Sequence, residues 1–263
     1  MGQLNEKFMK KSVFAFIFFM AFTSFAYSQT RVIAHRGFWK TQGSAQNSIT
    51  ALQRAAQAGV YGAEFDVWIT ADGVPVINHD KDINDVVIET STYDQVKGEK
   101  LPNGETISTL KEYLKAGAKY PEMKLILELK DHSKKENDMR AVEAVIELVR
   151  KSKAYRRGQM EFISFNYEMC KAFAKAFPDI PVAYLSGDKS PETLLKDGID
   201  GLDYHKAIVG VRKDWIRKAH ELGMTVNVWT VNKDSLIVRM GELGVDFITT
   251  DEPLRAIELL EKE

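Results

Sequence analysis

The chain has 263 residues, of which 44% are hydrophobic and 28% are charged, and its formal net charge is −1 at pH 7. This is the composition of an ordinary globular protein with enough apolar residues for a large core. The near-neutral charge, without a long Lys/Arg run after residue 20, excludes a strongly basic nucleic-acid-binding protein, so no nucleic-acid partner is expected.

The first 28 residues have the layout of a secretory signal peptide. Three lysines precede an apolar run over residues 12–26, and Ala26 and Ser28 place small residues at the −3 and −1 positions of a cut before Gln29. The run has 15 residues, fewer than the ~20 that span a bilayer, which favours cleavage over an uncleaved membrane anchor. We therefore expect residues 1–28 to be removed and the mature chain, residues 29–263, to be secreted or periplasmic, without stable membrane insertion.

The mature chain alternates short apolar runs with amphipathic segments. Runs rich in β-branched and aromatic residues predict strands at 32–35, 62–69, 74–78, 124–130, 160–165, 181–186, 199–203, 225–230 and 246–249. Amphipathic periodicity and helix end signals predict helices at 47–59, 108–118, 136–152, 167–177, 190–197, 212–223, 233–243 and 253–262. Strand 74–78 follows strand 62–69 through an Ala-Asp-Gly turn, which is typical of a hairpin. Without it, eight strands alternate with eight helices.

This alternation, without an interrupting linker, predicts one α/β domain, a (β/α)8 TIM barrel with a β-hairpin after the second barrel strand. The alternative is a doubly wound open sheet, but the sequence has no Gly-x-Gly-x-x-Gly turn to support it. The polar segment 80–107 is expected to form a small cap or insertion over the barrel mouth. Cys170, the only cysteine, lies in a helical pattern and is expected to be a buried thiol. The composition indicates no particular oligomeric state.

Three carboxylates are expected at the mouth of such a barrel. Glu64 and Asp66 are two residues apart on one predicted strand, so both side chains point to the same face. Glu128 lies near the end of strand 124–130. Buried carboxylates are costly unless something positive neutralises them. Because the trio offers only oxygen ligands, it predicts a site for one hard divalent cation, Mg²⁺ or Ca²⁺, rather than zinc.

Two histidines and two cationic side chains follow the ends of the same group of strands. They are His35 and Arg36 after the first strand, His79 after the hairpin strand, and Lys130 at the end of strand 124–130. A pair of imidazoles can take and give protons near neutral pH, while cations stabilise negative charge on phosphoryl oxygens. Together with a divalent cation, this set indicates a reaction on a phosphate ester.

Six motifs along the mature chain resemble those of the glycerophosphodiester phosphodiesterase family and occur in the family's order. They are HRG (35–37), EFDVWITADGVPVINHD (64–80), ISTLKEYL (107–114), LELK (127–130), WTVN (229–232) and FITTDEP (247–253). The resemblance implies a metal-dependent TIM-barrel enzyme that splits small-molecule glycerophosphodiesters into glycerol 3-phosphate and an alcohol. By matching position it implies acid/base roles for His35 and His79, metal binding by Glu64, Asp66 and Glu128, and phosphate contacts from Arg36 and Lys130.

Further positions follow from the same resemblance. Trp229 would wall the glycerol side of the pocket, although a strand tryptophan can also simply fill a core. His205 is a candidate for substrate contact or for a satisfied structural imidazole, and the Asn47 amide is a pocket candidate. The family usually has Pro-Glu-Asn-Thr where this chain has AQNS, so Gln46 replaces a charged residue. After NHD the chain has Ile83 but not the family's following arginine, which predicts an unusual cap.

Alternatives remain open for the mechanism and the function. The attacking group is either the substrate's own glycerol hydroxyl, which gives a cyclic phosphate that is then hydrolysed, or water. A phospholipase- or lyase-like enzyme acting on intact lipid would need an apolar rim, and the insertion offers only Val86, Val87 and Ile88. A non-catalytic barrel that binds a phospho-sugar or glycerol head group would be expected to lack one of the histidines or carboxylates, and all are present.

Overall fold

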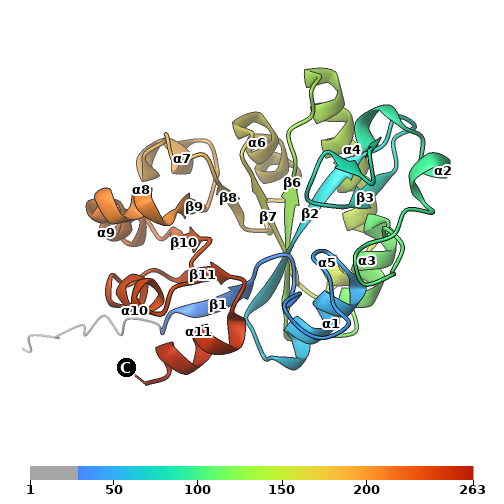
Figure 1. The fold of residues 1–263 in the computed structure, drawn as a ribbon. Coiled ribbons are helices and arrows are strands. Elements are labelled where there is room, and N and C mark those ends of the chain that lie inside the picture. Colours follow the sequence, from blue (N-terminus) through green and yellow to red (C-terminus); the bar gives the residue numbers. More distant parts are fainter. Residues whose placement is uncertain (1–28, 263) are drawn as a thin grey trace, which may run out of the picture.

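The structure, a computed structural model, describes residues 29–262, and within this range eight parallel strands close into a barrel surrounded by helices (Figure 1). In order around the barrel they are β1 (Arg31–Ala34), β2 (Gly62–Ile69), β6 (Lys124–Leu129), β7 (Met160–Ser164), β8 (Val182–Tyr184), β9 (Gly201–His205), β10 (Thr225–Trp229) and β11 (Phe247–Thr250). β11 pairs with β1 and closes the ring. This confirms the predicted TIM barrel. The signal-peptide prediction for residues 1–28 lies outside the described residues.

The helices that cover the barrel follow the predicted pattern closely. They are α1 (Ile49–Gln57), α3 (Leu110–Gly117), α4 (Lys135–Lys151), α6 (Tyr167–Ala176), α7 (Pro191–Lys196), α9 (Lys213–Glu221), α10 (Asp234–Glu242) and α11 (Pro253–Leu260). Three short α-helices were not predicted, α5 (Lys153–Arg156), α8 (Lys206–Val211) and, in the segment after β2, α2 (Tyr93–Val96), because four or six residues are too few to display a helical period. Among the described residues, no helix combines the length and apolar character needed to cross a membrane.

Side chains alternate between the two faces of the barrel strands, so that core residues lie on one face and candidate site residues on the other. On β2, Phe65 and Val67 are fully buried in the main hydrophobic core between strands and helices, whereas Glu64 and Asp66 lie on the other face. Cys170 is buried in the same core, as expected for a structural thiol. A separate apolar cluster contains Ile33, Ile126, Ile163, Leu185 and Phe247. The inward face therefore holds a limited set of polar residues among apolar ones.

Strand β9 begins and ends two residues later than predicted. Gly198, with φ +77°, lies just after α7, and Asp200 then caps the neighbouring strand by accepting a hydrogen bond from the Val182 N–H at 3.0 Å. Because these residues belong to the connection, the strand starts at Gly201 and pairs with β10 as far as His205 and Trp229. Asp203 consequently lies in the middle of the strand.

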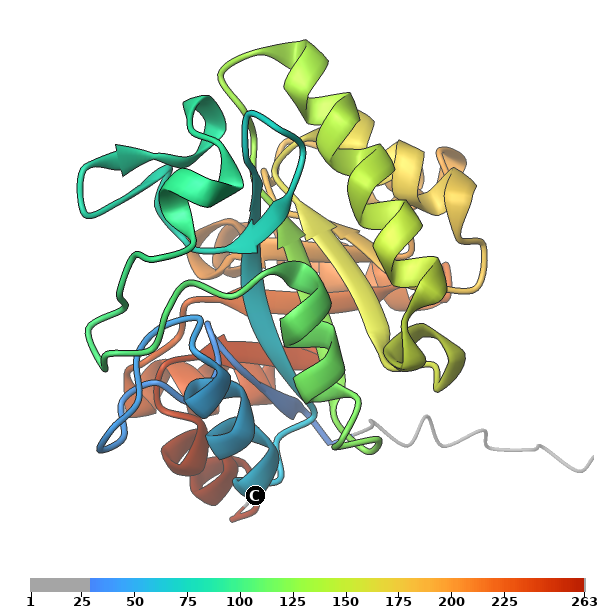
Figure 2. The same ribbon diagram turned by 90° about the vertical axis from the view of Figure 1, so that its right-hand side faces the viewer.

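The segment after β2 forms the predicted hairpin and insertion, at the barrel end where β2 terminates (Figure 2). It consists of β3 (Pro75–Ile77), β4 (Asp82–Ile83), β5 (Val86–Val87), the 3-10 helix η1 (Ile88–Thr90) and α2 (Tyr93–Val96). Its apolar residues pack in a core of their own with Trp68 of β2. Ile83 and Ile88 are buried there, whereas Val87 is 38% exposed.

Glu89 joins the insertion to the barrel. Its carboxylate accepts hydrogen bonds from the N–H groups of Ser133 and Lys134 and from the amide of Asn137, all at the start of α4. Burial raises the pKa of Glu89, but these hydrogen bonds, that of Asn137 first, outweigh burial and lower the pKa to about 2. The ionised carboxylate therefore stabilises the folded state.

Replacing Glu89 with glutamine is expected to lower the free energy of unfolding at pH 7 by about 1–3 kcal/mol. Because the folded-state pKa is depressed, this contribution is complete above the ordinary glutamate pKa and is lost as the pH falls toward about 2. Urea unfolding at pH 7 and at pH 3 should therefore show the two proteins converging at the lower pH. Glu143→Gln, at an exposed position of α4, is the control; a pH-independent difference would contradict the account.

Candidate active site

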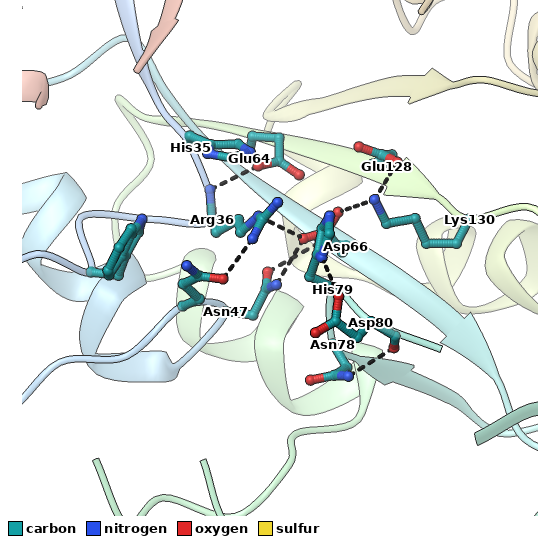
Figure 3. A network of polar contacts seen from close by, with 12 residues as sticks. His35, Arg36, Asn47, Glu64, Asp66, Asn78, His79, Asp80, Glu128 and Lys130 are labelled. Atoms are coloured by element: carbon teal, nitrogen blue, oxygen red, sulfur yellow. Dashed lines mark hydrogen bonds and ion pairs between the residues drawn. The ribbon is translucent and has the colours of Figure 1, made fainter. Parts of the chain in front are cut away.

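A cavity of about 140 Å³ lies at the mouth of the barrel. Seven of the residues singled out from the sequence line it: His35, Arg36, Glu64, His79, Glu128, Lys130 and Trp229. They come from the loop after β1, from β2, from the segment after β3, from the end of β6 and the residue after it, and from the end of β10. Figure 3 shows how the polar members of this set converge. Residues separated by almost 200 positions in the sequence thus meet because the carboxyl ends of parallel strands share one edge.

The three carboxylates form a compact group at the cavity, which Glu64 and Glu128 line and which Asp66 does not itself line. Glu64, Asp66 and Glu128 each place an oxygen within 4.8 Å of the others, and all three are buried. Register explains part of this, because Asp66 on β2 lies directly opposite Glu128 on β6. Burial, reinforced by the neighbouring carboxylates, raises the pKa of Glu64, and it raises that of Glu128 to about 7. The protein therefore does not supply enough positive charge to neutralise all three carboxylates.

The carboxylate oxygens of this trio are suitable ligands for a hard divalent cation. The Oε1 atom of Glu64 is buried and has no hydrogen-bond partner among the described residues, although the adjacent Oε2 accepts the Arg36 N–H at 2.7 Å. A buried carboxylate oxygen without a hydrogen-bond partner is rare and costly unless a bound ion neutralises it. Oxygen-only ligands of this kind suit Mg²⁺ or Ca²⁺.

Lys130 provides positive charge next to the carboxylates. Its Nζ lies 2.7 Å from Asp66 Oδ1 and 2.5 Å from Glu128 Oε1 (Figure 3). Burial lowers the pKa of Lys130, but these two carboxylates raise it more, so the ammonium stays charged. Burial likewise raises the pKa of Asp66, yet Lys130, with His79 and Arg36, lowers it below its ordinary value. Asp66 is the carboxylate of the trio that is ionised most readily.

The HRG turn brings Arg36 into the same cavity by an unusual backbone path. Arg36 has φ +56° and Gly37 has φ +73°, and a Cβ on Gly37 would lie 2.7 Å from the backbone of Ala51. Glycine is therefore required at this position. The guanidinium that results from this turn is 3.7 Å from Asp66 and donates to Gln46 Oε1 at 2.6 Å. Because Gln46 is neutral, it positions Arg36 without cancelling its charge.

Asn47 supports the site from behind rather than from the cavity wall. Its amide donates to Asp66 Oδ2 at 2.8 Å, and its side-chain oxygen accepts the Asp66 N–H at 3.1 Å. Its own N–H donates to the carbonyl of Arg36 at 3.0 Å, and its φ is +61°. Asparagine tolerates this left-handed conformation better than most residues. It therefore connects the HRG turn to a carboxylate of the trio.

Each cavity histidine has a carboxylate partner. His35 Nδ1 lies 2.7 Å from Asp251 Oδ1, and Asp251 also accepts hydrogen bonds from Trp39 and Asn232. Burial raises the pKa of Asp251, but these hydrogen bonds, that with His35 first, lower it to about 2. Asp251 was not predicted, although its place directly after β11, in the FITTDEP motif, could have indicated it. The strand-end position was the available signal.

The second histidine is more exposed. His79 Nδ1 lies 2.7 Å from Asp80 Oδ1 in the loop after β3. Burial lowers the pKa of His79, and Lys130 and Arg36 lower it further, while Asp66 opposes them. In both histidines the Nδ1 atom is engaged by a carboxylate, which leaves Nε2 for proton exchange.

The two remaining predicted residues lie side by side on β9 and β10. The Trp229 indole donates to the carbonyl of Asp203 at 2.9 Å, and its ring contacts those of Phe165 and His205 edge to face, with centroids 5.4 and 5.2 Å away. His205 accepts the N–H of Ala207 and so caps α8, beside Trp229 rather than on the cavity wall.

A TIM barrel that gathers an acidic trio, two cations and two histidines around one small cavity has the form of a phosphodiesterase. The model of the glycerophosphoryl diester phosphodiesterase family matches residues 35–255, and the chain belongs to this family. It is accordingly a phosphoric diester hydrolase.

Individual relatives agree with this membership. A glycerophosphodiester phosphodiesterase of Bacillus altitudinis is 28% identical over 252 residues, which cover 89% of this chain and 99% of the relative. The crystal structure of a glycerophosphodiester phosphodiesterase from Parabacteroides distasonis has a TM-score of 0.86 and 44% identity, covering 89% of this chain and 98% of that chain. A phosphodiesterase of Oleispira antarctica, solved with the product sn-glycerol-3-phosphate, has a TM-score of 0.74 and 25% identity over 89% and 97% of the two chains.

Proposed function

We propose that the mature chain hydrolyses glycerophosphodiesters to glycerol 3-phosphate and an alcohol, using one divalent cation and two histidines. The single observation that carries the proposal is the buried trio of Glu64, Asp66 and Glu128, with an unsatisfied oxygen on Glu64, next to Arg36 and Lys130 at one cavity. The bound product in the Oleispira antarctica structure supports glycerol 3-phosphate as the product here.

The trio would hold the cation, Mg²⁺ or Ca²⁺, which when bound supplies Lewis-acid stabilisation of charge on the phosphoryl oxygens. Arg36 and Lys130, which both lie next to Asp66 of the trio, bind the phosphate. Arg36 is suited to this because its Gln46 partner is neutral, so its charge stays available. Lys130 is fixed by two carboxylates and offers a compact ammonium to an anionic ligand.

His35 and His79 move the protons. One takes the proton of the attacking group, and the other gives a proton to the alcohol as it leaves. The attacking group is the hydroxyl of the substrate's glycerol, which gives a cyclic phosphate first, or a water molecule. Asp251 holds the His35 ring in one orientation, and Asp80 does the same for His79, so that both Nε2 atoms remain free for exchange.

A water-soluble substrate fits the insertion better than an intact lipid does. Ile83 and Ile88 pack into the insertion's own core, which leaves Val87 as its exposed apolar side chain. A rim of that size offers little surface for membrane docking. The proposal also keeps the location and domain organisation expected from the sequence: an exported enzyme whose signal peptide, residues 1–28, is removed from a single domain.

The first test is product release by the chain from Gln29 onwards. Protein treated with EDTA is expected to retain less than about 1% of its activity on glycerophosphocholine, and Mg²⁺ or Ca²⁺ should restore it. The assay should measure glycerol 3-phosphate and choline against glycerol and phosphocholine, because the pair formed identifies the bond that breaks. Full activity after EDTA treatment would contradict metal dependence. Folded, ion-loaded protein that releases neither pair would contradict the choice of substrate.

A further inference from the structure

Asp203 is a buried carboxylate on the cavity wall to which the mechanism above assigns no task. It lies in the middle of β9, is only 2% exposed, and lines the same cavity as His35 and Lys130. Its strand neighbours Leu202 and Tyr204 belong to the main core between the strands and the helices. Alternation therefore directs the Asp203 side chain into the barrel.

The protein leaves this carboxylate incompletely satisfied. Its Oδ1 atom is buried without a hydrogen-bond partner among residues 29–262. Burial raises the pKa of Asp203 to about 7; a hydrogen bond from Asn227 opposes this, while the carboxylates of Glu128 and Glu161 add to it. None of these neighbours is a cation. An apolar side chain would be cheaper here, since Ile163 and Leu185 line the same cavity.

Asn227 holds the carboxylate in place. It lies opposite Asp203 in the pairing of β9 with β10, and its amide also donates to Thr249 Oγ1 on β11 at 2.8 Å. Asp203, Asn227 and Thr249 thus form a polar row across three adjacent strands. Asp203 itself lines the cavity, and its Oδ1 atom is not used in a hydrogen bond within the described part of the protein.

The position of β9 indicates what this acceptor meets. In the closed barrel, three strands separate β9 from β2 in either direction, so Asp203 stands across the barrel from Glu64 and Asp66. Arg36 and Lys130 lie on the carboxylate side. A ligand whose phosphate lies beside these cations therefore reaches Asp203 with its other end, past the apolar side chains of Ile163 and Leu185.

We propose that Asp203 is the residue that selects a polyol, because it accepts a hydrogen bond from the hydroxyl farthest from phosphorus; this rests on the proposed function. A hydroxyl suits the position because it is a neutral donor, and it can donate to this side chain whether or not the carboxyl is protonated. It also provides a partner for Asp203 Oδ1, which the described part of the protein leaves unpaired. An alkyl group at the same place would leave that oxygen desolvated and unsatisfied.

The experiment compares glycerophosphocholine with an analogue in which hydrogen replaces the hydroxyl on the glycerol carbon farthest from phosphorus. For the unmodified enzyme, kcat/KM is expected to fall at least about 100-fold with the analogue, since a site built around a hydroxyl rejects a ligand that lacks it. Asp203→Leu should lose a similar factor on glycerophosphocholine and almost nothing on the analogue. Asp203→Asn, which keeps an acceptor oxygen, should retain most of the discrimination.

Equal losses on both substrates in Asp203→Leu, or equal kcat/KM values for both in the unmodified enzyme, would overturn the proposal. Calorimetric binding of glycerol 3-phosphate and of its deoxy counterpart gives a second readout that needs no turnover. Tighter binding of the hydroxylated ligand, lost in Asp203→Leu, supports the role of Asp203 even if catalysis of the chosen diester fails. Melting temperatures show that each variant is folded, and Asp203→Asn covers the case in which leucine is not tolerated.

Discussion

Replacing Glu64 with glutamine is expected to stop hydrolysis while making the metal-free protein more stable. The trio is destabilised by burial and by mutual repulsion, and an amide removes one charge and adds a donor between the remaining carboxylates. We expect the free energy of unfolding of the metal-free protein to rise by about 1–3 kcal/mol. Activity should fall at least about 10³-fold, because a catalytic cation contributes several kcal/mol to the transition state.

Thermal melts with and without Mg²⁺ or Ca²⁺ test both halves of this prediction. The unmodified protein should melt at a higher temperature when the ion is present, since a ligand at 100 times its Kd stabilises by about 2.7 kcal/mol. In Glu64→Gln this shift should be much smaller. Glu122→Gln, at an exposed position, is the matched control and should keep both the shift and the activity. A metal-free Glu64→Gln protein that is less stable would mean that the carboxylate serves the fold.

Removal of either cavity histidine is expected to lower kcat about 10²–10⁴-fold, the range over which a positioned acid or base accelerates proton transfer. His35→Ala and His79→Ala are distinguished by the leaving group. With a glycerophosphodiester of 4-nitrophenol, whose anion leaves without a proton, the variant that lacks the acid should recover most of its activity. The variant that lacks the base should remain slow. Stopped assays of both substrates with all three proteins provide the comparison.

His220→Ala is the control for this pair. His220 lies on α9 and is paired with Asp246, which immediately precedes β11 at the opposite end of the barrel. The same substitution there should leave kcat within about twofold, because surface changes away from the site have small effects. If both cavity variants stayed within tenfold of the unmodified enzyme on both substrates, the acid/base assignment would be wrong.

The barrel could be predicted from the sequence because its strands are buried on both faces and its helices are amphipathic, two patterns that are visible locally. The same reasoning brought Glu64 and Asp66 together, since a spacing of two on a strand fixes a shared face. The position of Glu128 beside these two residues could be predicted only from the barrel fold, because it depends on the register between β2 and β6.

Asp203 and Asp251 show where local pattern reasoning stops. Asp203 was placed at the end of its strand, and only the pairing of β9 with β8 and β10 moves it to the middle and onto the cavity wall. Asp251 is important because its side chain contacts His35, which is 216 positions away in the sequence. Such contacts are set by tertiary packing. The left-handed backbone at Asn47 is likewise a consequence of its contacts with Arg36 and Asp66.

The cavity divides between the two halves of the chain. The proposed catalytic groups, from His35 to Lys130, come from β1, β2, β3 and β6, whereas the facing wall, from Ile163 to Trp229, comes from β7, β8, β9 and β10. The groups proposed to break the bond and the residue proposed to select the polyol thus lie in separate stretches of sequence, with Asp251, which orients His35, in the second. Substitutions around Asp203 in the second stretch are expected to change the accepted polyol without altering the acidic trio, provided that they keep the contact of Asp251 with His35. This arrangement makes the fold well suited to evolve new diester specificities from one reaction.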